Sequence, residues 1–427
     1  MHKSNHDIEY DRLVPIIWHC IGIFIAAQSY IARNIASLMF FKTQKSNDFH
    51  NIEINEIKSI LIVRMDGLGD LMLSIGFLSS LRKLFQDAKI TLVVKKEFAM
   101  LIGNCNYIDN VIGFDTSCPR MLKPFVLPIR SMIFARKILA PLKFNLAINP
   151  RWDKDEYYAS FISFFAETKW NLAYSEKVNN KKKYYNNGFD SFLTACIKNS
   201  AKIHEYEKNM NIVCFLGGNP IMDGAAFNFT LKDRMFADTI LKAEEKGVKS
   251  MLIALAPGAR HDRRRWPIDR YIKLGIWLCD SFNARLLVLG DKNEKWLGDA
   301  IVHSTKESTM DLIGQTTLSQ ACALLKQCNL FIGNDSGLLH LAASQDIPVI
   351  EISCHPINGN LLDRQSPARF GPWTSRKIIL QPDVPKYPCV ESCDAPNSHC
   401  IENVSIEDVQ RAILSFLNKE HQLEYEN

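Results

Sequence analysis

The chain has 427 residues, more than one hydrophobic core of ordinary size accommodates, so we expect two domains of about 150 to 200 residues each. Its 47% hydrophobic and 23% charged residues are typical of globular proteins and exclude a disordered or fibrous chain. The 51 Lys and Arg against 46 Asp and Glu give a net charge of +5, which suits an anionic partner without requiring one; we expect no nucleic-acid partner. Twelve scattered Cys indicate a reducing compartment, the cytoplasm, rather than a secreted disulfide scaffold.

Residues 1–50 form a hydrophobic extension ahead of the first domain. Leu13 to Ala27 is almost entirely apolar, and no small-residue cleavage site follows it, so a signal peptide is not expected. Because a bilayer crossing needs about 20 apolar residues, residues 13–32 fit a spanning helix or an in-plane (monotopic) anchor on the inner membrane. A helix docked on the enzyme or on a second subunit is the other interpretation. If the helix crosses the membrane, the cations Arg33, Lys42 and Lys45 after it are expected to keep the enzyme body in the cytoplasm.

Alternating strands and helices begin after residue 51 and indicate a first domain over 51–225. The strand Ser59 to Met65, the turn DGLGD and the helix LMLSIGFLSSLRKLF are followed by the strand Ile90 to Val94 and by FNLAINP at 144–150. Continuous apolar strands of this kind are typical of a parallel sheet that is buried on both faces. Residues 175–200, rich in Asn and Lys, predict an exposed loop.

The same alternation restarts in a second domain over 226–402. Strands are predicted at 251–256, 285–290, 329–333 and 347–353, with helices between them, and residues 403–427 form a capped amphipathic helix and tail. Two parallel-sheet domains in tandem predict a ligand cleft between them, since such sheets bind ligands at the carboxyl ends of their strands.

The turn Gly67-Leu68-Gly69-Asp70 lies between a strand and a helix. Its glycines Gly67 and Gly69 allow a tight turn, but Met72 replaces the third glycine of a dinucleotide fingerprint, and a carboxylate is unfavourable beside a phosphate. Asp70 is placed either to accept a proton from a hydroxyl nucleophile or simply to cap the following helix. Spacing alone does not separate these two roles.

Two further strand-to-helix loops carry groups that suit an anion. Arg260, Arg263, Arg264 and Arg265 follow Pro257-Gly258-Ala259, and crowded guanidiniums suit a diphosphate better than a merely solvated loop. Gly333-Asn334-Asp335-Ser336-Gly337 precedes a helix with His340 in its first turn. The nucleophile elbow of a Ser hydrolase is absent there, so hydrolysis is set aside.

A fourth cluster consists of Cys389, Cys393, His399 and Cys400 in a Pro-rich stretch. Its thiolates and imidazole fit a structural metal, although the spacing is not that of a standard zinc pair. Free thiols under a loop and a redox-sensitive pair are the other interpretations.

Four segments, in this order and spacing, resemble the ADP-heptose:lipopolysaccharide heptosyltransferase family, glycosyltransferase family 9. They are ILIVRMDGLGD with LMLSIGFLSSLRKLF, then HEYEKNMNIVCFLGG, then IALAPGARHDRRRWPIDRYIKL, then DLIGQTTLSQACALLKQCNLFIGNDSGLLHLAA, and together they span Ile57 to Pro348. The resemblance implies a GT-B fold of two Rossmann-like parallel-sheet domains facing a central cleft, with the acceptor on the N-terminal domain and an ADP-sugar on the C-terminal domain.

The same resemblance implies roles for individual residues. Asp70 would be the general base of an inverting, single-displacement transfer of heptose, and Arg264 stands where the family commonly has Lys. The donor diphosphate would lie against Arg260, Arg264, Asp335, Ser336, Gly337 and His340, with Glu294 or Asp291 contacting the ribose. No metal or other cofactor would be required for the chemistry.

The acceptor implied by the resemblance is a lipopolysaccharide core sugar or a related glycan, and the hydrophobic extension favours a lipid-linked one. A protein hydroxyl, as in family members that modify autotransporters, is the alternative acceptor. A non-catalytic nucleotide-sugar-binding protein is a further class, while an NAD-dependent oxidoreductase or epimerase fails on the missing third glycine.

Overall fold

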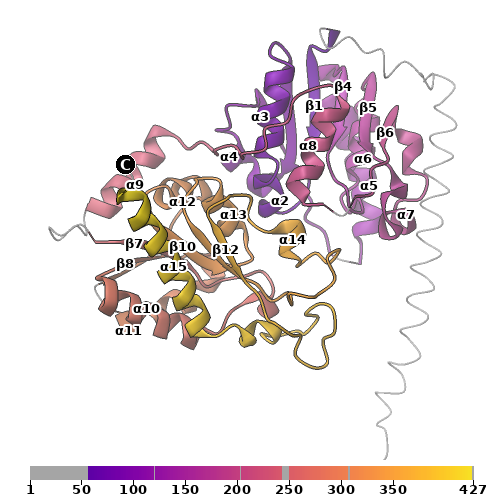
Figure 1. Cartoon of the computed structure of the whole chain (residues 1–427). Coiled ribbons are helices and arrows are strands. Elements are labelled where there is room, and N and C mark those ends of the chain that lie inside the picture. The colour runs from indigo at the N-terminus through magenta and orange to yellow at the C-terminus, as the bar shows by residue number, and fades with distance from the viewer. Residues whose placement is uncertain (1–55, 120, 202, 243–249, 306–307, 426–427) are drawn as a thin grey trace, which may run out of the picture. The chain divides into compact units, whose positions relative to one another are not determined.

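The computed structural model describes residues 56–425 except 120, 202, 243–249 and 306–307 (Figure 1). The predicted extension over residues 1–50 therefore lies outside the described residues. The described residues contain two parallel six-stranded sheets. Within those ranges, no helix combines the length and the apolar content that a bilayer crossing requires.

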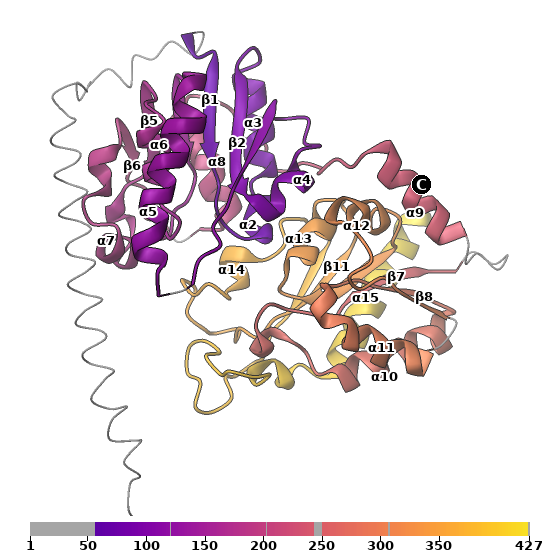
Figure 2. The same ribbon diagram turned by 180° about the vertical axis from the view of Figure 1, so that it is seen from behind.

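The first sheet is built from strands whose side chains are buried almost throughout. Its strand order is β3-β2-β1-β4-β5-β6, and all neighbours are parallel. The strands are β1 (Ser59–Val63), β2 (Lys89–Lys95), β3 (Asn110–Phe114), β4 (Leu146–Asn149), β5 (Trp170–Tyr174) and β6 (Ala195–Ile197). Helices α5 (Lys123–Phe134) and α6 (Ala159–Phe165) pack side by side on one face of this sheet (Figure 2).

The second sheet has the order β12-β11-β10-β7-β8-β9 and is also parallel throughout. Its strands are β7 (Leu252–Ala256), β8 (Arg285–Val288), β9 (Thr309–Asp311), β10 (Leu330–Asn334), β11 (Val349–Ile352) and β12 (Lys377–Leu380). Helices α10 (Ile268–Phe282), α11 (Lys295–Thr305), α12 (Leu318–Leu325), α13 (Gly337–Ala343) and α15 (Ile406–Tyr425) alternate with or follow these strands.

Both sheets have the same topology, the 3-2-1-4-5-6 order of Rossmann domains when the strands of each are counted in sequence. In that order the first and fourth strands are neighbours, and the chain leaves them toward opposite sides of the sheet. Ligands bind at this switch point, which here lies between β1 and β4 in one sheet and between β7 and β10 in the other. The predicted class of two Rossmann-like parallel-sheet domains is confirmed.

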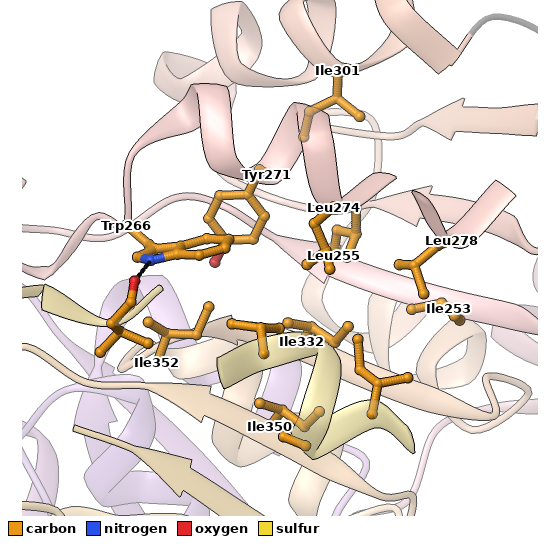
Figure 3. Packing of buried hydrophobic residues seen from close by; sticks show 14 of the residues in the cluster. Ile253, Leu255, Trp266, Tyr271, Leu274, Leu278, Ile301, Ile332, Ile350 and Ile352 are labelled. Carbon is orange, nitrogen blue, oxygen red and sulfur yellow. Dashed lines mark hydrogen bonds between the residues drawn. The ribbon is translucent and has the colours of Figure 1, made fainter. Parts of the chain in front are cut away.

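The core of the second sheet extends to the final helix. Trp266, Tyr271, Ile332 and Ile350 are fully buried in one cluster with side chains of α10, β7 and α15 (Figure 3). The Trp266 indole N–H donates to the Val404 carbonyl at 2.8 Å, which ties the residues before α15 to the start of α10. The buried Trp266 side chain therefore anchors the end of the loop after β7 in the core.

Contacts divide the chain into two compact units. The first comprises residues 1–65, 85–96 and 109–201, and the second comprises 66–84, 97–108 and 202–427. The second unit thus includes α2 (Leu68–Met72), α3 (Ile75–Leu84), α8 (Glu205–Phe215), α9 (Leu231–Lys242) and α14 (Pro367–Phe370) besides the second sheet.

The exposed loop predicted for residues 175–200 is wrong. This stretch folds into α7 (Asn180–Tyr185), two short 3-10 turns and β6. Asn179 caps α7 by accepting from the Lys182 N–H, and the Lys182 ammonium is buried, donating to the carbonyls of Arg151 and Tyr174 at 2.9 Å each. An Asn that caps a helix and a Lys with two buried acceptors look like loop residues when only composition is considered.

Candidate functional site

The loops after β7 and β10 meet through an ion pair between Arg264 and Asp335. The Arg264 Nη1 atom lies 2.8 Å from the Asp335 Oδ2 atom, and both side chains are mostly buried, at 19% and 14% exposure. Burial opposes the charged guanidinium, but the Asp335 carboxylate offsets this, so the pKa of Arg264 is raised. Two groups that the sequence placed 71 positions apart thus form one charged site at the switch point.

Asn334, at the end of β10, fixes the geometry of that site. Its Oδ1 accepts from the Trp266 N–H at 3.1 Å and from the Tyr271 hydroxyl at 3.2 Å, and its Nδ2 donates to the Pro257 carbonyl at 2.8 Å. Asn334 is fully buried. The sequence motif included this residue but gave it no role, because its partners lie about 70 residues away.

Several buried polar atoms beside the ion pair have no hydrogen-bond partner among the described residues. They are the Ser336 hydroxyl, the His340 Nδ1, the Arg264 Nε and the Glu351 Oε2. Buried polar atoms in folded proteins are normally satisfied by protein groups, water or a ligand, so this group of polar atoms can accommodate water or a polar ligand. Ser336 precedes α13 as its N-cap residue with an extended backbone, and its side chain makes no capping bond.

The protonation of this cluster follows from its burial. Burial lowers the pKa of His340 to about 4, so the imidazole is neutral at pH 7. Burial together with the Asp335 carboxylate raises the pKa of Glu351, which stands on β11 beside β10. Glu351 was missed in the sequence because it lies inside an apolar strand, where an isolated acid has no motif.

Arg263 and Arg265 of the same loop have other partners. Arg263 donates from Nε to the Gln365 Oε1 at 2.9 Å, and Arg265 donates to the Asp262 carboxylate at 2.8 Å and the Ala259 carbonyl at 3.0 Å. Arg260 is exposed at the start of the loop. Arg264 is therefore the guanidinium of this loop that the structure brings to Asp335, and a diphosphate contact by Arg260 stays a prediction.

The two ribose candidates are placed differently. The Glu294 carboxylate lies directly against Gly258, where a Cβ atom would come within 2.1 Å of its Oε2, and its Oε1 is 3.8 Å from Arg265. Asp291 is exposed, and its carboxylate accepts from the Asn293 N–H at 3.0 Å as a helix cap. Both carboxylates serve the local backbone, because the Glu294 Oε2 accepts from the Asp291 N–H at 3.0 Å in the same capping box, but only Glu294 also lies against the loop after β7.

Asp70 lies in the first turn of α2, half-buried, where its Oδ2 accepts from the Gly67 N–H at 3.4 Å. The capping role weighed from the sequence is thus present as a long hydrogen bond. Helix α2 packs on α13 within the second unit. A Cβ at Gly69 would be 2.6 Å from the His340 ring, and one at Gly337 would be 2.5 Å from Leu68, so Gly69 and Gly337 permit this close approach.

The four predicted metal ligands Cys389, Cys393, His399 and Cys400 are brought together by the structure. Their ligand atoms all lie within 4.8 Å of one another. They belong to the second unit and lie in the loop before α15.

Comparison with known proteins gives a family for the second half of the chain. Residues 224–399 match the model of glycosyltransferase family 9 (heptosyltransferase). The lipooligosaccharide heptosyltransferase 2 of Haemophilus influenzae is 30% identical over 130 residues, a match that covers 29% of this chain and 38% of that protein. The sequence match therefore spans little more than a third of that relative's length.

Solved structures show the same fold over most of the chain. A glycosyltransferase family 9 protein from Veillonella parvula superposes with a TM-score of 0.66 at 18% identity, covering 85% of this chain and 98% of the other. The E. coli heptosyltransferase WaaC with ADP superposes with a TM-score of 0.62 at 16% identity, covering 84% and 99%. These likenesses confirm the GT-B architecture of the predicted fold class. The Arg264 loop and the Asp335 turn both lie inside the range 224–399 that matches the model of glycosyltransferase family 9 (heptosyltransferase), so the family resemblance of the sequence motifs is confirmed over that range.

Proposed function

We propose that the protein is an inverting glycosyltransferase that moves a heptose from ADP-heptose to a sugar of a lipopolysaccharide or lipooligosaccharide core. The family 9 domain and the heptosyltransferase relatives support the reaction class. The ADP in the solved E. coli heptosyltransferase supports the nucleotide. The observation that carries the proposal is the buried Arg264–Asp335 pair at the β7/β10 switch point, surrounded by unsatisfied polar atoms of Ser336, His340 and Glu351.

The donor would bind at this switch point with its diphosphate on Arg264. The guanidinium can donate to phosphate oxygens while Asp335 keeps it oriented, and the Ser336 hydroxyl adds a neutral donor. Glu294, lying against Gly258, is placed to accept from the ribose hydroxyls. A neutral His340 adds no charge of its own but supplies a ring nitrogen for a further hydrogen bond.

Transfer would proceed in one displacement. The acceptor hydroxyl oxygen forms a bond to the anomeric carbon, its proton passes to the Asp70 carboxylate, and the bond from the anomeric carbon to the diphosphate oxygen breaks. A general base of this kind contributes about 10² to 10⁴ in rate. The charge that develops on the departing ADP is stabilised by Arg264, so the donor side needs no metal for this step.

We place this reaction at the cytoplasmic surface of the inner membrane, with a lipid-linked acceptor. The apolar run Leu13 to Ala27 and the cations that follow it support this setting.

A donor and acceptor panel tests the proposed function. The purified full chain is mixed with ADP-heptose, ADP-glucose, GDP-mannose or UDP-glucose and with core oligosaccharides that lack successive sugars, and products are identified by mass. We expect a product heavier by one heptose, with release of ADP, only for ADP-heptose and one acceptor length. Transfer from a uridine or guanosine donor in preference to ADP-heptose would contradict the donor assignment.

A further inference from the structure

Three sulfur atoms and one imidazole nitrogen converge before α15. The His399 Nδ1 lies 3.6 Å from the Cys389 sulfur and 3.5 Å from the Cys400 sulfur, and all four ligand atoms, with that of Cys393, lie within 4.8 Å of one another. Zinc binds thiolate at about 2.3 Å and imidazole at about 2.0 Å in a tetrahedron, which sets sulfur to nitrogen at about 3.6 Å. The two distances to His399 match those of ligands around one ion, and they equally match thiol–imidazole hydrogen bonds in the metal-free site.

The surroundings of the sulfurs also suit thiolates. The backbone N–H of Lys386 donates to the Cys400 sulfur at 3.4 Å, and those of Ala395 and Cys400 donate to the Cys393 sulfur. Cys393 and Cys400 are fully buried, while Cys389 and His399 are partly exposed. Amides directed at metal-bound sulfur orient the ligands and spread the charge of the thiolates.

The loop that holds these residues has little regular structure of its own yet supports the donor site. Between β12 and α15 it contains one 3-10 turn, over Cys400–Asn403. The Ser398 hydroxyl donates to the Arg265 carbonyl at 2.9 Å. The Gln365 amide donates to the Cys393 carbonyl at 3.0 Å while its Oε1 accepts from Arg263 at 2.9 Å. An ion at the cluster would therefore hold the loop that steadies the Arg263–Arg265 segment.

We propose that Cys389, Cys393, His399 and Cys400 bind one structural Zn²⁺ in a closed Cys₃His site. Four protein ligands leave no open position for a substrate, so the ion stabilises the loop rather than taking part in transfer. The competing arrangement is a thiol pair, because the Cys354 thiol also contacts the Cys393 sulfur.

Metal analysis of the purified full chain tests this site. After expression with zinc and iron supplied, elemental analysis should find about one zinc per chain. The double variant Cys393→Ser/Cys400→Ser should lose the ion, whereas Cys328→Ser, which removes another buried thiol of the same unit, should keep it. Iron in place of zinc would overturn the choice of ion.

Titration of the native chain with Co²⁺ tests the site without depending on the folding of the double variant. The native full chain, stripped with a chelator and titrated with Co²⁺, should develop thiolate-to-cobalt charge-transfer bands and tetrahedral visible bands at one equivalent, which added Zn²⁺ abolishes. Absence of these bands, or a chain without metal and with a Cys354–Cys393 disulfide by mass, would overturn the site.

A second observation concerns the outer face of α5 in the first unit. Its buried face carries Leu127 and Ser131, but the opposite face exposes large apolar side chains at helical spacing. These are Leu122 at 49%, Phe125 at 52%, Ile129 at 58% and Ile133 at 45% exposure, followed by Ile138 at 47% and Leu142 at 50%. A stripe of this kind on a surface helix marks an interaction surface.

The charge around this stripe has one sign. Between Asp115 and Asp153 the sequence has no Asp or Glu, while it has seven Lys or Arg. Arg136, Lys137 and Lys143 are exposed next to the apolar residues. An apolar face with cations along it is typical of helices that lie in the interface of an anionic membrane.

We infer that this α5 face docks on an anionic phospholipid surface. The inference rests on the proposed function for its membrane setting. The lipid-binding test uses neither donor nor acceptor, so its result is independent of transferase activity. The absence of carboxylates argues against a second copy of the chain as the occupant, since two such faces would repel each other.

Vesicle flotation tests the α5 face in full-length chains that all carry Ile17→Asp/Ile25→Asp, which interrupts the apolar run Leu13 to Ala27 so that the extension does not anchor every variant. The triple variant Phe125→Ser/Ile129→Ser/Ile133→Ser should bind phosphatidylglycerol-containing vesicles about tenfold more weakly or worse. The control Leu231→Ser/Met235→Ser, which removes two exposed apolar residues of α9, should bind like the chain with native α5 and α9. The inference would be overturned if the triple variant bound vesicles as well as that chain does. It would also be overturned if the substitutions abolished dimers, seen by light scattering, instead of vesicle binding. Neither result would bear on ADP-heptose transfer.

Discussion

At the scale of single residues, Arg264 carries the electrostatics of the proposed donor site. It is paired with Asp335 at 2.8 Å and largely buried, so a diphosphate would meet an oriented guanidinium rather than a mobile one. Arg260 has the same charge but is exposed at the loop start. The two residues therefore form a matched pair for mutation.

We expect Arg264→Ala to weaken ADP binding by about tenfold to a hundredfold, because a charge-assisted contact is lost. Arg264→Lys should recover only part of the affinity, since an ammonium lacks the planar fork. Isothermal titration with ADP measures both, with Lys273→Ala, which removes an exposed cation of α10, as the control. An Arg260→Ala loss as large as that of Arg264→Ala would show that the diphosphate lies elsewhere on the loop.

Buried neutral histidines make stability depend on pH. Burial lowers the pKa of His204 to about 3 and that of His340 to about 4, whereas in the unfolded chain each titrates near 6.5. Between these values the unfolded state binds more protons, so stability is full above pH 6.5 and is lost as pH falls from 6.5 toward 4. Each histidine contributes a slope of about 1.4 kcal/mol per pH unit in that window.

Urea unfolding at pH 7 and pH 5 checks this slope. The variant His204→Asn keeps a side chain that can cap α8, a role in which His204 now accepts from the Tyr206 N–H at 3.1 Å. We expect it to lose less stability on acidification than the native chain. An identical pH dependence would mean that His204 does not stay neutral in the fold.

At the scale of elements, the packing of α2 on α13 depends on glycine. A Cβ at Gly69 would meet the His340 ring at 2.6 Å, whereas one at Gly67 would meet nothing closer than the Asp70 carboxylate at 3.7 Å. We expect Gly69→Ala to destabilise the chain by about 1 to 3 kcal/mol through overpacking, and Gly67→Ala by less than about 1 kcal/mol. Equal melting temperatures for the two variants would contradict the close contact.

The α8 and α14 elements are joined by a buried ionic network. The Glu205 carboxylate lies 2.7 Å from the Lys208 ammonium and 2.5 Å from the Arg369 guanidinium, and all three side chains are at most 5% exposed. Glu205→Ala removes the carboxylate that both buried cations contact and should cost about 3 to 5 kcal/mol. Breaking the exposed pair Asp269–Lys273 by Asp269→Ala is the control and should cost less than about 1 kcal/mol. Denaturant unfolding compares them, and equal losses would contradict the network's role.

Much of the element order could be predicted from the sequence, and the reasons differ between elements. The continuous apolar runs of β1, β2, β7, β10 and β11 stand out because both faces of these strands are buried. The edge strands β3, β6, β9 and β12 do not, because their side chains are mostly only partly buried. Local pattern therefore finds the centre of a sheet better than its margin.

The site could be predicted only as a set of loops. Strong local signals, glycines and clustered arginines, marked the turn at Asp70, the Arg260 to Arg265 loop and the Asp335 turn. The pairing of Arg264 with Asp335 depends on β7 and β10 being neighbours in the sheet. The roles of Asn334 and Glu351 depend on the same strand order. Strand order is a long-range property that no short motif encodes.

At the scale of the whole molecule, the chain repeats one topology twice, and each copy offers a switch point at the ends of its first and fourth strands. In the second copy this point carries the Arg264–Asp335 pair. In the first, the chain leaves β1 into the turn that bears Asp70. A transferase that binds two substrates has a use for two such positions, one for the donor and one for the acceptor.

The central claim, that Asp70 activates the acceptor while the second sheet holds the donor, is tested most directly by Asp70→Asn. Turnover of ADP-heptose with a core acceptor and the affinity for ADP are measured on the same preparation. Turnover should fall by about 10² to 10⁴ while ADP binding stays within about threefold of the native value. Retained turnover in Asp70→Asn would contradict this claim.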